Sequence, residues 1–276
     1  MSCNSKKHID IQGHRGCRGL LPENSLPAFE KAIDLGVHTL ELDVVVSKDL
    51  KVVVSHEPYI NSEICKLTDD GLADSTMALR FNLFEMTYDH IKSFDCGSKY
   101  IARFPEQKKI KTYKPLLSEV FELVNTKNSK VKFNIEIKTQ QAYEYGIFTP
   151  QPNLYVNVVL DEIKKSGLIE NINLQSFDLE ILEEIKKQSP KIPVALLVDE
   201  DETINSKLKR LSYRPEIISP YFKLLSQQMV KDYQSEDYLV IPWTVNGVED
   251  MKKMIVWGVD GIITDYPDLL MSVLED

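Results

Sequence analysis

The sequence lacks any apolar run that approaches the roughly 20 residues needed to cross a bilayer, so no transmembrane segment is predicted. It also lacks a cationic excess, since 33 Lys and Arg residues stand against 42 Asp and Glu residues, for a formal net charge of -9. Nucleic-acid binding needs a basic surface from which counterions are released, so this charge argues against a nucleic-acid partner. No internal repeat or low-complexity tract is present. Nothing in the sequence indicates an oligomeric state, whether monomer or assembly.

Cysteine is scarce, and the four cysteines show no CxxC or zinc-type spacing: Cys3, Cys17, Cys65 and Cys96. We expect buried or unreactive thiols, with a Cys65–Cys96 disulfide as the alternative if the protein is exported. The polar first seven residues resemble the stretch after a bacterial lipoprotein cleavage site, yet no apolar segment precedes Cys3. A cytoplasmic protein is expected if Met1 is the native start, and an exported protein or lipoprotein if a signal was removed.

Short apolar segments alternate with amphipathic ones along the chain, which is typical of a parallel sheet with helical crossovers. Strands are expected at Ile9–Gly13, Thr39–Val46, Val52–Ser55, Val131–Ile137, Ile172–Gln175, Pro193–Val198, Glu216–Ser219, Leu239–Thr244 and Gly261–Thr264. Helices are expected at Leu26–Leu35, Leu117–Asn125, Tyr155–Ser166, Leu179–Gln188 and Val248–Trp257, with Ser118, Asp178 and Asn246 or Gly247 at or beside N-caps. About eight βα units in 276 residues predict an α/β protein, a single-domain (β/α)₈ barrel over residues 1–276.

One stretch, about residues 57–113, is far longer than an ordinary loop and follows the second strand region. We expect an inserted subregion, with Thr87 capping a short helix whose Ile91 and Phe94 face inward. Because the insertion leaves the barrel directly after His56, we expect it to select part of the ligand. Its polar residues suit a soluble group better than an acyl chain, among them Asp69, Asp70, Asn82 and Arg103.

Acids and bases gather where the expected strands end: His14-Arg15-Gly16, Glu41-Leu42-Asp43, His56-Glu57 and Glu136-Ile137-Lys138. Residues two apart in a strand point to the same face, so Glu41 and Asp43 project together, as do Glu136 and Lys138. Barrel enzymes place their chemistry at the carboxyl ends of strands. Each cluster alone fits a solvated or structural group, but burying several like charges without a cation costs several kcal/mol. Together they predict a metal-assisted site that handles phosphate.

At these residues the chain resembles the glycerophosphodiester phosphodiesterase family of phosphatidylinositol-phosphodiesterase-like barrels. Further matching segments follow in the family's order over nearly the whole barrel: Pro22-Glu23-Asn24-Ser25 with Ala28-Phe29 and Ala32, Ser176-Phe177, Trp243-Thr244-Val245-Asn246, and Asp260-Gly261-Ile262 with Thr264-Asp265 and Pro267. The resemblance implies a (β/α)₈ barrel that hydrolyses small-molecule glycerophosphodiesters to sn-glycerol 3-phosphate and an alcohol, as part of glycerol and lipid metabolism.

The resemblance also implies roles for particular residues. A divalent cation, Ca²⁺ or Mg²⁺, would be held by Glu41, Asp43 and Glu136. His14 and His56 would form the acid/base pair. Substrate-binding residues would be Arg15 and Lys138 on the phosphate and Trp243 on the glycerol, although an aromatic residue at a strand end is as often barrel packing.

Several neighbouring residues receive weaker interpretations. The family usually has His-Asp where this chain has His56-Glu57, and no catalytic role is assigned to Glu57. Asn246 is expected either to contact substrate or to cap the next helix. Residues 23–25 are expected to shape the first loop, with Ser25 as a cap, and residues 264–267 to form the turn before the last helix. The remaining histidines are expected to be structural or exposed: His8, His38 and His90.

Two other functions remain open at this point. A lipid phosphodiesterase of the phospholipase C or D type would use similar histidines but need an apolar surface for lipid. A barrel that keeps the fold and binds a phosphate ligand without turnover is the second alternative.

Overall fold

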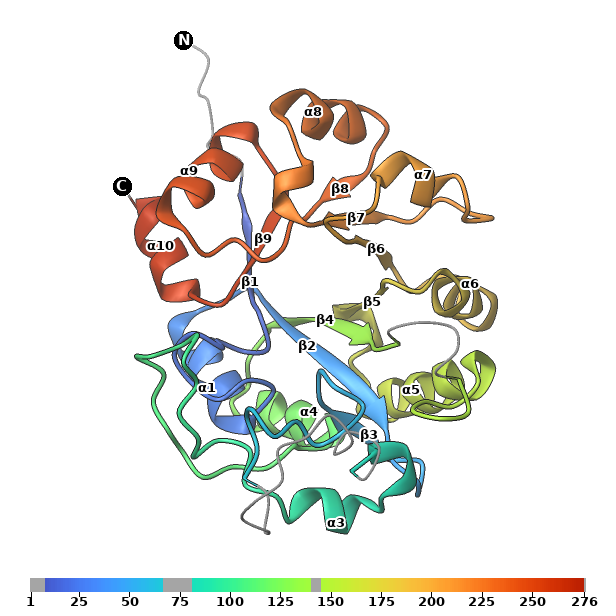
Figure 1. Ribbon diagram of the computed structural model, residues 1–276. Helices are drawn as coiled ribbons and strands as arrows, with labels where there is room; N and C mark the ends of the chain where they lie inside the picture. Colours follow the sequence, from blue (N-terminus) through green and yellow to red (C-terminus); the bar gives the residue numbers. More distant parts are fainter. Residues whose placement is uncertain (1–7, 67–80, 140–144, 276) are drawn as a thin grey trace.

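The computed structural model describes residues 8–66, 81–139 and 145–275 (Figure 1). Eight parallel strands form a nearly closed barrel in the order β8-β7-β6-β5-β4-β2-β1-β9. Their bounds are β1 Asp10–Gly13, β2 Thr39–Val46, β4 Lys132–Ile137, β5 Ile172–Ser176, β6 Val194–Val198, β7 Ile217–Pro220, β8 Leu239–Val240 and β9 Gly261–Thr264, and β3, Val52–Val54, pairs antiparallel with β2. Backbone bonds beyond β8 complete the circle, since Val245 N donates to Ile263 O at 2.9 Å. The (β/α)₈ prediction is confirmed.

Helices surround the strands (Figure 1). Their bounds are α1 Leu26–Leu35, α3 Tyr88–Lys92, α4 Leu117–Thr126, α5 Pro152–Ser166, α6 Leu179–Gln188, α7 Ile204–Leu208, α8 Gln227–Ser235, α9 Val248–Trp257 and α10 Pro267–Glu275, with 3₁₀ turns at η1 Leu83–Glu85, η3 Ile169–Asn171 and η4 Phe222–Leu224. Among the described helices, none is both long and apolar enough to cross a membrane. The sequence analysis did not predict α7 or α8, and α7 is only five residues long.

Helix caps follow the sequence only in part. Ser25 Oγ accepts from Ala28 N at 3.4 Å, and Asp178 Oδ1 accepts from Glu180 N at 2.8 Å, so both predicted caps are present. Ser118, by contrast, lies inside α4, where the Glu119 carboxylate accepts from Leu116 N instead. Thr87 holds the N-cap position of α3 without a side-chain capping bond.

The barrel interior has an apolar half and a polar half. The apolar half is a small layer of side chains from four strand regions: Ala195, Ile217, Ile241 and Ile263. The polar half is a set of buried amides in which Asn134 Nδ2 donates to Gln12 Oε1 at 2.9 Å and to Gln175 Oε1 at 3.0 Å. Gln175 Nε2 in turn donates to Glu41 Oε1 at 2.9 Å, so the amides support the site from below.

The described part of the insertion has its own apolar core. Several buried side chains of the insertion pack with Val45 and Val53 of the barrel, among them Ile60, Ile91 and Phe94. This confirms that Ile91 and Phe94 face inward. Asp69 and Asp70 lie outside the described residues.

The cysteine prediction needs a correction, because Cys65 and Cys96 form a disulfide rather than free thiols. The sequence does not show that their neighbours Lys66 and Asp95 pair in a β-bridge, which brings the two cysteines together. Cys17 is buried and free, as expected, and burial raises the pKa of its thiol to about 12. Cys3 lies outside the described residues.

Candidate active site

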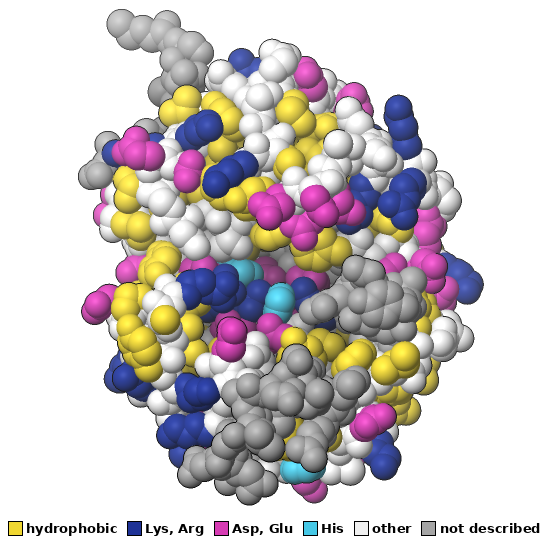
Figure 2. Space-filling view, viewed as in Figure 1, with side chains coloured by type: hydrophobic (Ala, Val, Ile, Leu, Met, Phe, Trp, Pro, Cys, Tyr) yellow, Lys and Arg dark blue, Asp and Glu magenta, His cyan; other side chains and the backbone are white. Residues whose placement is uncertain are grey.

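A cleft of about 870 Å³ opens at the carboxyl ends of the strands. Figure 2 shows this hollow at the centre of one face, with histidine, cationic and acidic side chains gathered in it. The residues that the sequence singled out come together here: His14, Arg15, Glu41, His56, Glu136, Lys138 and Trp243 line the cleft, and Asp43 lies beside Glu41 and Glu136. We refer to this space as the main cleft.

The His14-Arg15-Gly16 turn is shaped by backbone constraints. Arg15 has a φ of 50° and Gly16 a φ of 88°, so both lie in the left-handed region. A Cβ on Gly16 would stand 2.8 Å from the Ala28 carbonyl carbon, and only glycine fits against α1. In this conformation Arg15 N donates to Glu41 Oε2 at 2.9 Å, which ties the turn to β2.

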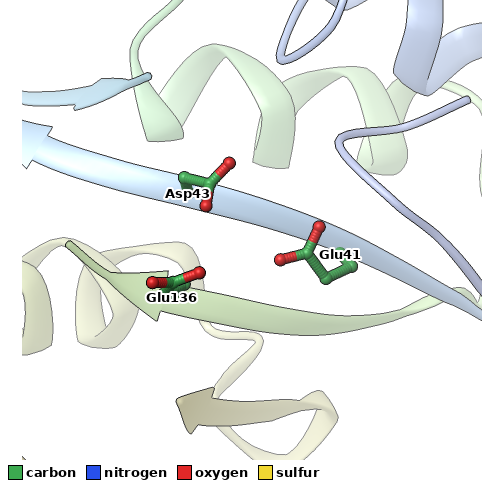
Figure 3. A group of neighbouring side chains, drawn as sticks. All are labelled: Glu41, Asp43 and Glu136. Atoms are coloured by element: carbon green, nitrogen blue, oxygen red, sulfur yellow. The ribbon is translucent and has the colours of Figure 1, made fainter. Parts of the chain in front are cut away.

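Glu41, Asp43 and Glu136 form a compact group (Figure 3). Asp43 of β2 and Glu136 of β4 are direct partners in the parallel register. Each of the three residues offers an oxygen, and these oxygens lie within 4.8 Å of one another. Asn24 Nδ2 donates to Asp43 Oδ2 at 2.8 Å, whereas the buried Asp43 Oδ1 accepts no hydrogen bond. An acceptor left in this state is suited to a cation.

The electrostatics of the three carboxyl groups also favour a bound cation. Burial, then the charges of Asp43 and Glu136, raise the pKa of Glu41 well above its usual range. Burial also raises the pKa of Glu136 to about 7, against the opposing effect of Lys138. Burial would raise the pKa of Asp43 too, but Arg15 and other cations hold it below its usual range. Without a bound cation the group therefore retains protons that a cation would displace.

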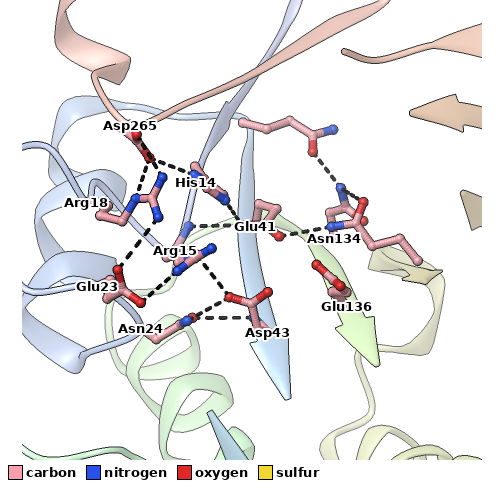
Figure 4. Close-up of polar contacts among 12 residues, drawn as sticks. His14, Arg15, Arg18, Glu23, Asn24, Glu41, Asp43, Asn134, Glu136 and Asp265 are labelled. Atoms are coloured by element: carbon pink, nitrogen blue, oxygen red, sulfur yellow. Dashed lines mark hydrogen bonds and ion pairs between the residues drawn. The ribbon is translucent and has the colours of Figure 1, made fainter. Parts of the chain in front are cut away.

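His14 is held by Asp265 (Figure 4). His14 Nδ1 lies 2.6 Å from Asp265 Oδ1, and Arg18 donates to both Asp265 oxygens at 2.9 and 3.0 Å. Burial first, and then the charge of Arg18, lowers the pKa of His14 to about 4. His14 Nε2 lies 3.9 Å from Glu41 Oε2, so the second ring nitrogen faces the carboxylates.

Sequence reasoning missed Asp265 and Arg18. Asp265 is part of the segment that resembles the family, but the pattern of residues 264–267 indicates only a turn before the last helix and no partner for a histidine. Asn246 proves to be another partner of Asp265, since its Nδ2 donates to Asp265 Oδ2 at 2.8 Å and its Oδ1 accepts from Asp265 N at 2.9 Å. The capping alternative for Asn246 is therefore wrong, and Gly247 is the N-cap of α9.

His56 has a carboxylate partner of its own. His56 Nδ1 lies 2.8 Å from Glu57 Oε1, and burial, then Arg15, lowers the pKa of the imidazole. Two hydrogen bonds fix the turn at residues 55–57. Ser55 Oγ donates to Glu57 O at 2.6 Å, and the buried Lys114 Nζ donates to Ser55 Oγ at 2.8 Å. The longer carboxylate of Glu57 thus reaches the ring, and Lys114 adds a cation that the sequence did not reveal.

The two expected phosphate-binding cations are both buried among carboxylates. Arg15 lies 2.7 Å from Glu23 and 3.3 Å from Asp43, and Lys138 Nζ lies 2.8 Å from Glu136 and 4.0 Å from Asp43. Burial would lower the pKa of Lys138, but Glu136 and Asp43 raise it above its usual range. Both side chains therefore carry a positive charge on the cleft wall.

Trp243 combines packing with exposure to the cleft. Its Nε1 donates to Ser219 O at 2.9 Å, and its ring meets Phe177 edge to face at 5.4 Å between centroids. The other histidines stay outside the site as expected: His38 Nδ1 accepts from Ile11 N at 2.9 Å, the His8 ring contacts the His38 ring at a tilt of 59°, and His90 is exposed.

Comparison with known proteins identifies the class to which this barrel and site belong. The model of the glycerophosphoryl diester phosphodiesterase family matches residues 14–269. A glycerophosphodiester phosphodiesterase of Caldanaerobacter subterraneus subsp. tengcongensis is 31% identical over 267 residues, which is 96% of this chain and 97% of the relative. The chain belongs to the glycerophosphoryl diester phosphodiesterase family.

Solved structures agree on the fold. A putative glycerophosphoryl diester phosphodiesterase of Silicibacter pomeroyi superposes with a TM-score of 0.84 at 27% identity, covering 98% of this chain and 95% of that one. A phosphodiesterase of Oleispira antarctica, solved in complex with its product sn-glycerol-3-phosphate, has a TM-score of 0.77 at 22% identity and covers 97% of both chains.

Proposed function

We propose that this protein hydrolyses glycerophosphodiesters to sn-glycerol 3-phosphate and an alcohol. The observation that carries the proposal is the pairing of His14 with Asp265 and of His56 with Glu57 on one cleft beside three buried carboxylates. Family membership and the product bound to the Oleispira antarctica phosphodiesterase support the substrate class.

A divalent cation fits Glu41, Asp43 and Glu136. The donors are hard carboxylate oxygens, the type that Ca²⁺ and Mg²⁺ prefer, and Asp43 Oδ1 accepts no hydrogen bond from the residues that the structure describes. When bound, such an ion supplies positive charge that polarises a phosphoryl oxygen. Gln175 and Asn24 hold Glu41 and Asp43 in place through side-chain hydrogen bonds.

The two imidazoles act on protons. With Nδ1 engaged by a carboxylate, each ring presents Nε2 to the cleft. One imidazole takes the proton of the attacking hydroxyl, which is that of water or of the substrate's glycerol C2, as the new P–O bond forms. The other gives a proton to the leaving oxygen as the ester P–O bond breaks, which releases the alcohol. Attack by water gives sn-glycerol 3-phosphate directly. Attack by the C2 hydroxyl gives a cyclic phosphate, and water then adds to its phosphorus as the P–O bond to C2 breaks and the C2 oxygen takes up a proton, which yields the same product.

Arg15 and Lys138 neutralise the phosphate oxygens as negative charge accumulates. Trp243 offers the carbon face of the glycerol an apolar contact. The outer rim of the main cleft carries charged side chains, which suit a soluble diester better than an acyl chain: Glu180, Asp199, Asp201, Glu202 and Arg210. This rim disfavours the phospholipase alternative.

The test is incubation with glycerophosphocholine and glycerophosphoethanolamine, with and without added metal, followed by detection of glycerol 3-phosphate. His14→Ala and His56→Ala should each lower turnover by roughly 10²-fold or more, because each removes one proton transfer. His90→Ala, which removes an exposed histidine, is the control and should retain activity. Near-native turnover of either variant with metal present removes that histidine from the mechanism, and tight binding of a diester without turnover supports the silent-binder alternative.

A further inference from the structure

A second chamber of about 600 Å³ adjoins the main cleft. The two spaces share four lining residues, Arg15, Arg18, His56 and Arg103, so they meet beside His56. The rest of the second chamber is lined mostly by the insertion, including Glu63, Lys99, Tyr100 and Phe104. A group attached to a phosphate in the main cleft can therefore extend past His56 into this chamber.

Among the charged side chains that line the second chamber, those without an ion-pair partner in the described part of the chain are mainly positive. Glu23 is paired with Arg15, and Glu57 with His56, so that Glu63 is the carboxylate of this lining that pairs with no cation within the described part of the chain. Arg103 and Lys99 form no ion pair with the residues that the structure describes, although Lys99 Nζ donates to the carbonyl oxygen of Ser62. Arg103 is exposed and stands at the junction with the main cleft.

Cationic side chains of the protein already lie over the aromatic rings of the second chamber. The guanidinium carbons of Arg18 and Arg103 lie 5.1 and 5.0 Å from the centroid of Phe104, and Lys109 Nζ lies 5.1 Å from that of Tyr100. Quaternary ammonium groups are recognised by free aromatic faces together with negative charge. The second chamber offers cations on its rings instead, so it is poorly suited to choline.

We propose that the second chamber receives the leaving alcohol and favours a polyhydroxylated alcohol, such as glycerol or inositol, over a quaternary ammonium alcohol. This inference rests on the proposed function. Arg103 has no acceptor within the described protein, so its N–H groups are free to donate to hydroxyl oxygens, whereas they repel an ammonium. Among the polar residues that the sequence singled out in the insertion, Arg103 is therefore the one assigned to this selection. Asn82 is already engaged, since its Nδ2 donates to Ile147 O at 2.6 Å and its Oδ1 caps η1.

The experiment compares kcat/KM for glycerophosphoglycerol, glycerophosphoinositol and glycerophosphocholine in four proteins: wild type, Arg103→Gln, Arg103→Lys and Arg214→Gln. Wild type should prefer the two polyhydroxylated substrates by about 3- to 10-fold, the effect of one or two hydrogen bonds and a removed repulsion. Arg103→Gln should reduce this preference by a similar factor, mainly through KM, and Arg103→Lys should keep most of it. Arg214→Gln is the matched control, because Arg214 is also an exposed arginine, 4.4 Å from the Tyr238 ring, but lines neither space.

The outcomes separate the two proposals. Hydrolysis of all three substrates with an equal loss in Arg103→Gln for each assigns Arg103 to the phosphate, and it overturns the inference while leaving the proposed function intact. An unchanged ranking in Arg103→Gln, or a wild-type preference for glycerophosphocholine, also overturns it. Absence of hydrolysis of all three by metal-loaded wild type overturns both proposals.

Discussion

Asp265 connects sequence positions at opposite ends of the chain, since its partner His14 lies 251 residues away. The carboxylate is almost fully buried and also binds Arg18 and Asn246. Such a carboxylate fixes the tautomer and orientation of an imidazole. We therefore propose that Asp265 is a positioning residue whose effect on the substrate passes through His14.

Replacement of Asp265 by asparagine should lower kcat by about 10²- to 10⁴-fold, because an amide can hold the wrong His14 tautomer. KM should change much less, since Asp265 does not face the substrate. Steady-state kinetics check this, with circular dichroism and thermal unfolding to confirm that the variant folds. A kcat within a factor of three of wild type contradicts the positioning role.

We propose Glu57 as a second positioning carboxylate, because its Oε1 lies 2.8 Å from His56 Nδ1. Glu57→Gln should lower kcat by about 10-fold or more, because the amide no longer compensates the imidazolium charge that forms during turnover. Glu57→Asp restores the carboxylate and should recover part of the rate. If glutamine supports turnover as well as aspartate does, charge at position 57 is irrelevant to His56.

If Glu136 is a metal ligand, metal binding should depend on pH. Its pKa of about 7 in the folded protein lies above its usual value of 4.5, so in metal-free protein its contribution to stability is full below pH 4.5 and is lost as the pH rises through 7. A bound cation replaces the proton and removes this loss. The rise in Tm caused by Ca²⁺ or Mg²⁺ should therefore be larger at pH 8 than at pH 5.

Thermal unfolding of chelated and metal-loaded protein at the two pH values measures this difference. Other groups also make stability depend on pH, His14 among them, because its pKa of about 4 in the folded protein lies below its usual 6.5. The comparison is therefore made with Glu136→Gln, in which the pH dependence of the metal effect should shrink. Equal metal-induced shifts at pH 5 and pH 8 in wild type contradict the assignment of Glu136 as a ligand.

At the scale of elements, the insertion is cross-linked by its disulfide, which joins cysteines 31 positions apart. Closing a loop of this length in the unfolded chain stabilises the folded state by about 3–4 kcal/mol on the chain-entropy model. The Cys65→Ala/Cys96→Ala variant should therefore unfold at lower denaturant concentration than oxidised wild type. Reductant should destabilise wild type and leave the variant unaffected, and a wild-type protein indifferent to reductant contradicts the cross-link.

The strands were predictable from sequence because parallel strands are buried on both faces, so that their apolar runs stand out between turns. Thr39–Val46 and Gly261–Thr264 match their predicted bounds. β8 is the exception, as it ends at Val240 rather than Thr244. Pro242 has no N–H to donate to a sheet ladder, which explains why regular pairing stops early.

The candidate site was predictable where its residues share a strand and not where distant segments meet. Glu41 and Asp43 share a face by strand alternation, and Glu136 joins them through parallel register. Asp265 resembled a turn residue, and Lys114 reaches Ser55 across the whole insertion. Partners of this kind depend on tertiary contacts that no local pattern encodes.

At the scale of the whole molecule, the barrel holds a group of carboxylates whose oxygens suit a cation, and two carboxylate-paired histidines line the same cleft. The proposed reaction requires all three parts at once. Removing the cation should therefore abolish turnover while leaving the barrel folded, since the carboxyl groups can retain protons instead.

The most direct test is product analysis by ³¹P NMR after incubation of chelated, metal-analysed protein with glycerophosphoglycerol and glycerophosphocholine, before and after addition of Ca²⁺ or Mg²⁺. The account predicts no reaction without metal and, with metal, a single new phosphorus signal, that of sn-glycerol 3-phosphate, from both substrates. Full turnover by metal-free protein, or phosphocholine as the product from glycerophosphocholine, would contradict it.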